Sequence, residues 1–523
     1  MNDIETFLGL FGISFFWRQA LVILCLFLLG AVGMAVIFKG QVILKRLLMA
    51  YPLGLAVYAL AGYVMLLVRI PFCAASFIII YFLLMAAGAV LIVRQGKGQM
   101  ITKLRQREAL EGGAHKQDAA DDHYGKMPLI MAIFIVIAVA LISCAGIFSV
   151  SVSNDSVYYY STFPAILVHD EGYSASMDLF LTNVGQATAV INALPFLFGF
   201  DQSFGIQTAL ILNFIGIFAL AARDFAMEQG LGKKGGMIAA LLSAALLLSS
   251  ESFLAISKWI LSNAYFMVYL FLAVLLGRTM GLDHSEGLGL GIIEGIFIGM
   301  LSMLRVEGGV VAAVLILSIS LLNIDKKRMM LIFFLPLALS QAAYFCMLFL
   351  TLGVNPLYSF MDWTKAVLMM GMLLMLAVYI LFIRDRLPYK WTPLILCAAM
   401  LLGNGELALI NRGRYFTNLY AFYQNIKQQN GWGLMGAMLL LYGFLAVACA
   451  FRRRFKNIGF IDAAVFALAL AIVAACWARG GVLAVRTSDS GNRALMQLTP
   501  LFIYGFYCHV IRLITPTSSP RPE

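Results

Sequence analysis

"MPLIMAIFIVIAVALISCAGIFSVSVSNDSVYYY", residues 127–160, joins a continuous apolar run to an acid and three tyrosines. The run at 127–149 is long enough for a helix to cross a bilayer core of about 30 Å. Lipid offers the backbone no hydrogen-bonding partner, so a segment in contact with it must be helical. The stretch therefore predicts a membrane-spanning helix that emerges into a polar segment near Asp155.

Runs of the same kind recur along the 523 residues, of which 62% are hydrophobic and 12% charged. An ordinary soluble domain has about a quarter charged residues, and the runs do not alternate as barrel strands do. We therefore predict an all-α polytopic membrane protein with about 15 transmembrane helices (range 13–15) and interface helices in a large external loop. The predicted spans are 17–38, 47–68, 72–93, 127–149, 205–222, 236–252, 262–277, 288–304, 306–323, 329–351, 366–383, 391–409, 433–450, 458–478 and 495–511.

The loops between these spans share the basic residues unequally. When the loops are numbered alternately, one set and the C-terminal tail carry 26 of the 37 Lys and Arg residues, and the other set carries 11. By the positive-inside rule the richer set is cytoplasmic. This predicts a multi-pass protein of the cell membrane with its N-terminus outside and its C-terminus in the cytoplasm. The net charge of +11 then indicates topology and contact with anionic lipid headgroups, and not nucleic-acid binding.

The loop at 94–126 mixes both charge signs and marks a boundary. We expect an N-terminal three-helix membrane unit at 1–93, a cytoplasmic linker at 94–126 and a larger transmembrane core at 127–523. Within the core, 150–204 is predicted to be one external loop. Its later part is only patchily apolar, which is typical of helices that lie in the membrane interface.

Ionisable residues that survive in a membrane protein are functional candidates, and many of them fall on the predicted outer side. Arginine suits phosphate because its planar fork donates two bonds at once. A carboxylate suits removal of a proton from a hydroxyl group. Together they suggest transfer from a lipid phosphate to an acceptor. The candidates are Asp155, Tyr158, Tyr159, His169, Asp170, Glu171, Lys258, Arg305, Glu307, Arg486 and Arg493.

Local patterns in this order resemble the GT-C class of integral membrane glycosyltransferases, which use polyprenyl-phosphate-linked sugars. They are a spanning helix that leads into an early acid ("GIFSVSVSNDSVYYY"), the Arg-x-Glu-Gly turn of "GMLSMLRVEGGVVAAV", and a late Arg ahead of a Pro-containing last helix ("SGNRALMQLTPLFIYGF"). The resemblance covers roughly 127–513 and does not include the helices at 17–93. It implies an inverting glycosyltransferase with Asp155 as the general base, a polyprenyl-phosphate-sugar donor, and a glycan, lipid or protein acceptor.

The metal requirement is open. Many members of the class carry two acids in the first loop, whereas Asn154 precedes Asp155 here. No cofactor is indicated for certain, and a divalent cation remains an alternative.

Each candidate also has a structural interpretation. Asp155 is equally a helix cap or a loop acid, and the tyrosines an interfacial aromatic belt. His169, Asp170 and Glu171 are typical of a hydrophilic turn, and Lys258 of a side chain that snorkels to the interface. Arg305 and Glu307 are placed to pair with each other, and Arg493 to pair with Asp489 or Glu307.

Two other functions compete with sugar transfer. A transporter or flippase of lipid-linked oligosaccharide should place ionisable residues near mid-membrane and break helices in both halves. Only Glu294 clearly fits that pattern. A polymerase or ligase of lipid-linked glycans would use the same donors and arginines.

The topology is testable in intact cells. In a background without native cysteines, Arg454→Cys should be protected from a membrane-impermeant maleimide, because the basic loop at 452–456 is predicted to be cytoplasmic. Asp170→Cys should be labelled. Labelling of position 454 from outside would overturn the predicted orientation.

Overall fold

The computed structural model describes residues 2–37, 43–110, 154–174, 177, 185–199, 204–282, 287–320, 322, 327–351, 362–386, 392–452, 459–480 and 482–515. Within these ranges every regular element is a helix. Ten of the described helices are long and apolar enough to cross a membrane, or eleven if α10 (Gly232–Leu248) and α11 (Glu251–Lys258), bent by 66°, form one span. The chain is a polytopic helical membrane protein.

Every predicted span that falls on described residues coincides with a helix, and the span at 127–149 lies outside them. The total of about 15 stays a prediction, because some helices are short: α14 is about 18 Å long at 1.5 Å per residue, against about 30 Å for the bilayer core. The helices are α1 (Asn2–Ile37), α2 (Ile43–Leu67), α3 (Ala74–Leu110), α9 (Phe204–Glu228), α12 (Ser262–Leu282), α13 (Gly287–Leu304), α14 (Gly308–Ile319), α15 (Lys327–Phe345), α16 (Trp363–Val378), α17 (Thr392–Ile410), α19 (Met435–Arg452), α20 (Phe460–Ala478), α21 (Ser490–Met496) and α22 (Thr499–Ile514).

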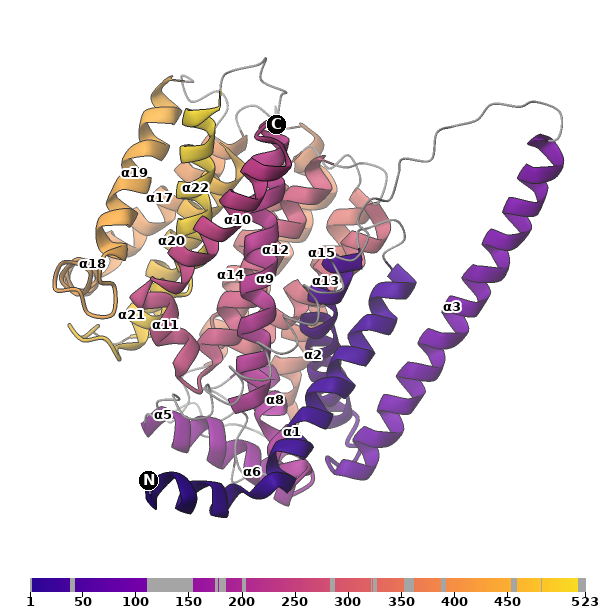
Figure 1. The fold of residues 1–523 in the computed structure, drawn as a ribbon. Coiled ribbons are helices and arrows are strands. Elements are labelled where there is room, and N and C mark those ends of the chain that lie inside the picture. The colour runs from indigo at the N-terminus through magenta and orange to yellow at the C-terminus, as the bar shows by residue number, and fades with distance from the viewer. Residues whose placement is uncertain are drawn as a thin grey trace.

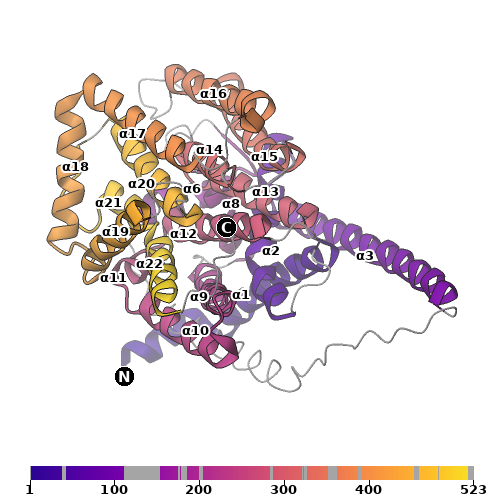
Figure 2. The same ribbon diagram turned by 90° about the horizontal axis from the view of Figure 1, so that it is seen from above.

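Most of these helices run along one common direction, and a few shorter ones lie across it (Figures 1 and 2). In Figure 1, α5 (Asn154–Val157) and α6 (Phe163–His169) cross the lower end of the bundle, while the described chain ends at the upper end. The two views together show that α18 (Arg412–Lys427) also lies across the bundle axis. The helix α3 lies at the edge of the bundle in both views and packs against α1.

Basic residues from three helix ends contact the end of α9 at the upper end, which we call the basic end. Lys45 Nζ lies 2.6 Å from Asp224 Oδ2, and Arg278 donates to Glu228 Oε2 over 2.6 Å. The Arg512 guanidinium lies 5.5 Å from the ring centre of Phe225. The predicted alternation of loops therefore brings these basic residues to one end, while the side of the membrane that this end faces stays a prediction.

The helix α8 (Gln186–Leu197) differs from expectation. The sequence predicts an interface helix here, but α8 is buried from Gln186 to Pro195 and packs against α2, α6 and α13. Its polar side chains find partners inside: Thr188 donates to the Leu304 carbonyl over 2.9 Å, and the Tyr173 hydroxyl donates to the Gln186 side-chain oxygen. Because buried polar groups that are hydrogen-bonded cost little, a patchily apolar helix can lie inside the bundle.

The N-terminal helices pack into this bundle. The hydroxyl of Tyr269 on α12 donates to the Pro52 carbonyl of α2 over 2.7 Å, and Tyr51 of α2 donates to the Ile206 carbonyl over 3.0 Å. Helices α1 and α2 also cross closely, because a Cβ added at Gly54 would lie 1.8 Å from the Leu26 carbonyl oxygen. Small residues allow such close backbone approach in membranes. Residues 111–153 are not described, so the proposed division at 94–126 stays a prediction.

The close crossing of α1 and α2 predicts that a methyl group added at Gly54 will destabilise the protein. Gly54→Ala should lower the free energy of unfolding by about 1–3 kcal/mol or more, because the added Cβ meets backbone that cannot yield easily. The matched control is Gly371→Ala on α16, where an added Cβ meets nothing within 4 Å. It should be neutral or stabilising by about 0.5–1 kcal/mol. Thermal unfolding of both variants in detergent checks this, and equal melting temperatures would contradict the close crossing.

Candidate functional site

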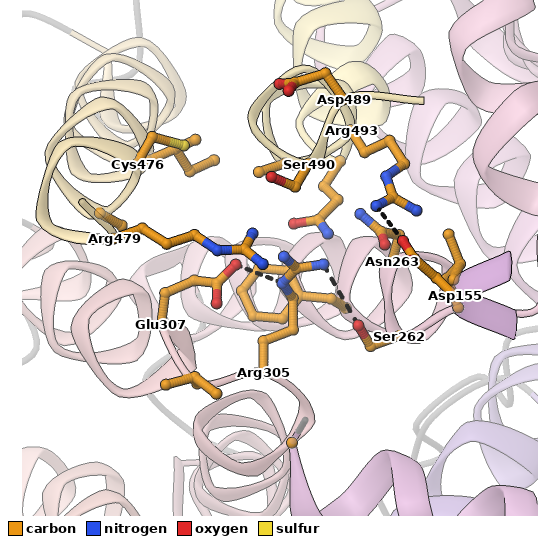
Figure 3. A pocket seen from close by; sticks show the side chains of 18 of the residues that line it. Asp155, Ser262, Asn263, Arg305, Glu307, Cys476, Arg479, Asp489, Ser490 and Arg493 are labelled. Atoms are coloured by element: carbon orange, nitrogen blue, oxygen red, sulfur yellow. Dashed lines mark hydrogen bonds and ion pairs between the residues drawn. The ribbon is translucent and has the colours of Figure 1, made fainter. Parts of the chain in front are cut away.

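A cavity of about 320 Å³ lies at the end of the bundle opposite the basic end. Segments far apart in the sequence supply its walls: α5, the first turn of α12, the turn between α13 and α14, the end of α20, and α21 with the segment before it. Figure 3 shows how their side chains converge. Among the described residues that line it, the charged ones are Asp155, Arg305, Glu307, Arg479, Arg486, Asp489 and Arg493.

Asp155 and Arg493 form an ion pair inside this cavity. Arg493 Nη2 donates to Asp155 Oδ2 over 2.8 Å, across a sequence separation of 338 residues. The Arg493 side chain is 10% exposed and that of Asp155 45%. The guanidinium carbon also lies 5.8 Å from the centre of the Trp259 ring. The partner of Arg493 is therefore Asp155, and neither Asp489 nor Glu307.

Both carboxylate oxygens of Asp489 accept hydrogen bonds from backbone amides, which explains why Asp489 does not pair with Arg493. It is the N-cap of α21 and accepts from the Gly491 and Asn492 amides over 2.9 and 3.1 Å. Its other oxygen accepts from the Ala484 amide over 2.9 Å. A carboxylate is favourable at a helix N-terminus. Asp489 thus fixes the start of the helix that presents Arg493.

The helix α18 lies outside the cavity and forms hydrogen bonds to the segment that precedes α21. Asn418 Oδ1 accepts from the Leu483 amide over 3.0 Å, and Asn425 Nδ2 donates to the Ala484 carbonyl over 3.0 Å. Beyond the end of α18, the Trp432 indole donates to Asn492 Oδ1 over 2.8 Å. In the structure α18 supports the segment that carries Arg486 and does not itself line the cavity.

A second ion pair occupies the turn between α13 and α14. Arg305 Nε donates to Glu307 Oε1 over 2.5 Å, and Arg305 Nη1 donates to Ser262 Oγ over 3.4 Å. The Tyr160 hydroxyl also lies 3.0 Å from Ser262 Oγ. Burial alone would raise the pKa of Glu307, but the charges of Arg305 and Arg479 outweigh it and hold that pKa below its usual value of 4.5. Glu307 is therefore ionised at neutral pH.

The structure brings together six of the candidate residues and leaves others outside. Asp155, Tyr159, Arg305, Glu307, Arg486 and Arg493 line the cavity. His169, Asp170 and Glu171 lie exposed at the end of α6 and do not line it. Lys258 is exposed at the end of α11 and is also absent from the lining. The side chain of Tyr158 is outside the described part of the structure.

The turn at the end of α6 has its own internal bonding. His169 Nδ1 lies 2.9 Å from Asp170 Oδ1, and the Ser174 hydroxyl donates to Asp170 Oδ2 over 2.5 Å. Glu171 has a φ of +52°, and its carbonyl accepts from the Phe72 amide over 2.8 Å. This geometry is that of a hydrophilic turn, which follows α6 and is hydrogen-bonded to the residues just before α3.

Sequence reasoning missed two buried amides in the cavity, Asn263 and Gln497, each 2% exposed. Asn263 follows Ser262 at the start of α12, and Gln497 lies between α21 and α22. The available signal was a small polar pair, "SN", directly before an apolar run.

Metal ligands do not gather in the part of the chain that the structure describes: no group of three or more His, Cys, Asp or Glu side chains there could hold an ion. The carboxylate of Asp155 instead faces an arginine. A requirement for a divalent cation therefore stays open.

In comparisons with protein-family models, curated protein sequences and solved structures, none matched this chain.

The ion pair at Glu307 predicts a dependence of stability on pH. Because the pKa of Glu307 is lowered on folding, the stability it contributes is present above pH 4.5 and is lost as the pH falls below that value. Between pH 6 and pH 4 the melting temperature of the wild type should therefore fall further than that of Glu307→Gln. At pH 7 the variant should be less stable by about 1–3 kcal/mol, since the Arg305 charge loses its ionised partner. Parallel pH dependences would contradict the lowered pKa.

Proposed function

We propose that the protein is a membrane glycosyltransferase that moves a sugar from a polyprenyl-phosphate donor to a lipid, glycan or protein acceptor, with inversion at the anomeric carbon. The observation that supports this is the presence of a carboxylate, Asp155, and several arginines in one cavity. The proposal includes the GT-C-like core of about 15 spans, and it places the cavity on the outer side of the membrane.

Arg493 is the residue we assign to the donor phosphate. It is held by a capped helix, it is 8% exposed, and no described residue hydrogen-bonds to its Nε–H. While Nη2 bonds Asp155, the Nε–H remains for a phosphate oxygen. Charge grows on that oxygen as the sugar leaves, and a preorganised donor there stabilises the transition state by about 2.7–4 kcal/mol.

Asp155 is the residue we assign to the acceptor. In the proposed reaction, the acceptor hydroxyl oxygen bonds to the anomeric carbon while the bond from that carbon to the phosphate oxygen breaks. The electron pair of the broken bond goes to the phosphate, and the hydroxyl proton goes to Asp155. The ion pair supports this division of roles, because it holds the base 2.8 Å from the cation that would bind the leaving group.

The size of the cavity agrees with a ligand of this kind. Its volume of about 320 Å³ is near the lower end of the roughly 300–1,000 Å³ that small-molecule sites occupy. A sugar and a phosphate suit this space, whereas a polyprenyl chain does not and would lie along the apolar surface outside it. The charged lining also suits a polar ligand more than an apolar one.

A transporter or flippase is the second candidate, and one residue favours it. Glu294 of α13 is fully buried, and neither of its carboxyl oxygens has a hydrogen-bond partner among the described residues. Buried ionisable residues within the membrane mark transport pathways in many proteins. A transporter would move the intact donor, however, and would not release isoprenyl phosphate. A glycan polymerase or ligase would share the chemistry proposed here and differ in its acceptor.

The decisive variant is Asp155→Asn, which keeps the size of the side chain and removes its basicity. Transfer should fall by about 10²–10⁴-fold, the contribution of a general base, while the protein still folds because Asp155 is half-exposed. Membranes containing each variant would receive short-chain isoprenyl-phosphoryl hexoses and pentoses in turn. Release of isoprenyl phosphate and formation of a glycosylated product would be measured together.

The control is Asp362→Asn. Asp362 caps α16 and does not line the cavity, and Asn caps helices as well as Asp does. It should retain both turnover and melting temperature. Turnover by Asp155→Asn close to that of the wild type would remove Asp155 from the mechanism. Movement of an intact donor without release of isoprenyl phosphate would favour the transporter instead.

A further inference from the structure

Two buried carboxamides in the cavity have no role in the proposed transfer chemistry. The Asn263 and Gln497 side chains are each 2% exposed, and both line the cavity. Asn263 Nδ2 and Gln497 Nε2 have no hydrogen-bond partner in the described part of the chain. Figure 3 draws Asn263 on the side of the cavity that holds Asp155 and Arg493, away from Arg479.

A buried amide whose N–H donors have no hydrogen-bond partner lowers the stability of the folded protein. A buried donor without a partner loses about 1–3 kcal/mol relative to its hydrated state, so native proteins pair nearly all such groups. Asn404 follows that rule: it donates to the Met400 carbonyl over 2.9 Å and accepts from the Tyr415 hydroxyl over 3.2 Å. Among the described residues Gln19 Nε2 and Asn418 Nδ2 also lack a partner, but neither side chain lines the cavity. Two exceptions in one cavity point to partners that a ligand supplies.

The chemistry of the amides restricts what the ligand can be. Each carboxamide offers two N–H donors and one carbonyl acceptor, whichever way the group is turned. No hydrogen bond joins either side chain to a described residue, so both functions are available. A phosphodiester can only accept hydrogen bonds, and it would leave the amide carbonyls without donors. A hydroxyl group both donates and accepts, and neighbouring hydroxyls on a ring satisfy an amide on both sides.

We propose that Asn263 and Gln497 form a neutral subsite for the hydroxyl groups of a sugar ring, beside the Asp155–Arg493 pair. The inference rests on the proposed function for the identity of the ligand, and it adds the residues that would distinguish one sugar from another. Arg493 would bind the phosphate and Asp155 would accept the acceptor proton. The sugar ring would lie between the two amides and hydrogen-bond to both. Fixed amides reject an analogue that lacks a hydroxyl, because their own groups are then left unpaired.

The backbone positions support a fixed subsite. Asn263 lies in the first turn of α12, which is anchored by Ser262 through its contacts with Tyr160 and Arg305. Gln497 is the C-cap of α21, four residues after Arg493. Both amides are thus carried by the same elements that position the ion pairs, so the distance between the subsite and the charged groups is set by the fold.

The test is direct binding, which requires no turnover. Purified protein in detergent would be titrated calorimetrically with a short-chain isoprenyl phosphate, and with the same compound carrying glucose, mannose or galactose. In the wild type at least one hexose should tighten binding on the order of tenfold over the phosphate alone. Asn263→Leu and Gln497→Met should each reduce that gain about 3–10-fold, the worth of one or two neutral hydrogen bonds, while affinity for isoprenyl phosphate stays unchanged.

Stability separates a ligand subsite from a structural role. Because no hydrogen bond from the residues that the structure describes depends on these amides, Asn263→Leu and Gln497→Met should keep or raise the melting temperature. The control, Asn404→Leu, should lower the melting temperature and retain the gain from the hexose. A fall in melting temperature for Asn263→Leu as large as that for Asn404→Leu would overturn the proposal. An undiminished hexose gain in both cavity variants would also overturn it, as would a wild type that no hexose binds more tightly than isoprenyl phosphate alone.

The outcomes also separate this inference from the enzyme assignment. A hexose gain that depends on the amides, in a protein that never releases isoprenyl phosphate, would support the subsite and contradict the transferase. Turnover that depends on Asp155, with a hexose gain indifferent to both amides, would support the transferase and contradict the subsite.

Discussion

Backbone hydrogen bonding within each helix is the constraint on which the rest of the structure depends. In lipid no water replaces a lost bond, so long apolar segments must close their own bonds as helices. Polar side chains inside the bundle face the same demand. Those of α8 meet it by bonding to neighbouring elements, as Thr188 does with the Leu304 carbonyl. Among the described residues, three polar atoms that do not meet it lie in the cavity at the helix ends: Asn263 Nδ2, Arg493 Nε and Gln497 Nε2.

The cavity combines strongly fixed charges with neutral groups that have no partner. Asp489 caps α21, and this cap sets the direction from which Arg493 enters. On another wall of the cavity, the ion pair of Arg305 with Glu307 holds the turn between α13 and α14 in place. The amide groups of Asn263 and Gln497 also line this cavity, and no described residue hydrogen-bonds to their nitrogen atoms. Four of the seven charged side chains that line the cavity among the described residues are held in two ion pairs, so a ligand meets several groups that the protein already positions.

The sequence predicted the helices well and the site in part, for physical reasons. Continuous apolar runs define helices without reference to anything distant, and each run on described residues became a helix. The ion pair of Asp155 with Arg493 joins residues 338 positions apart, and no local pattern encodes it. Burial of α8 was missed because hydropathy cannot show that Gln186 and Thr188 find partners inside. The two amides were missed because a neutral residue gains significance only when its surroundings leave it unpaired.

The position of α18 has a mechanical consequence. Its asparagines bond the 482–489 segment, and Trp432 at its far end bonds Asn492, the neighbour of Arg493. Hydrogen bonds of this kind transmit displacement rather than absorb it. These hydrogen bonds, with that from Asn492 Nδ2 to the Arg486 carbonyl, join the helix, the loop with Arg486 and the start of α21 into one connected unit. A displacement of Arg486 relative to Arg493 would therefore have to break hydrogen bonds between their two segments, such as that from Asn492 Nδ2 to the Arg486 carbonyl.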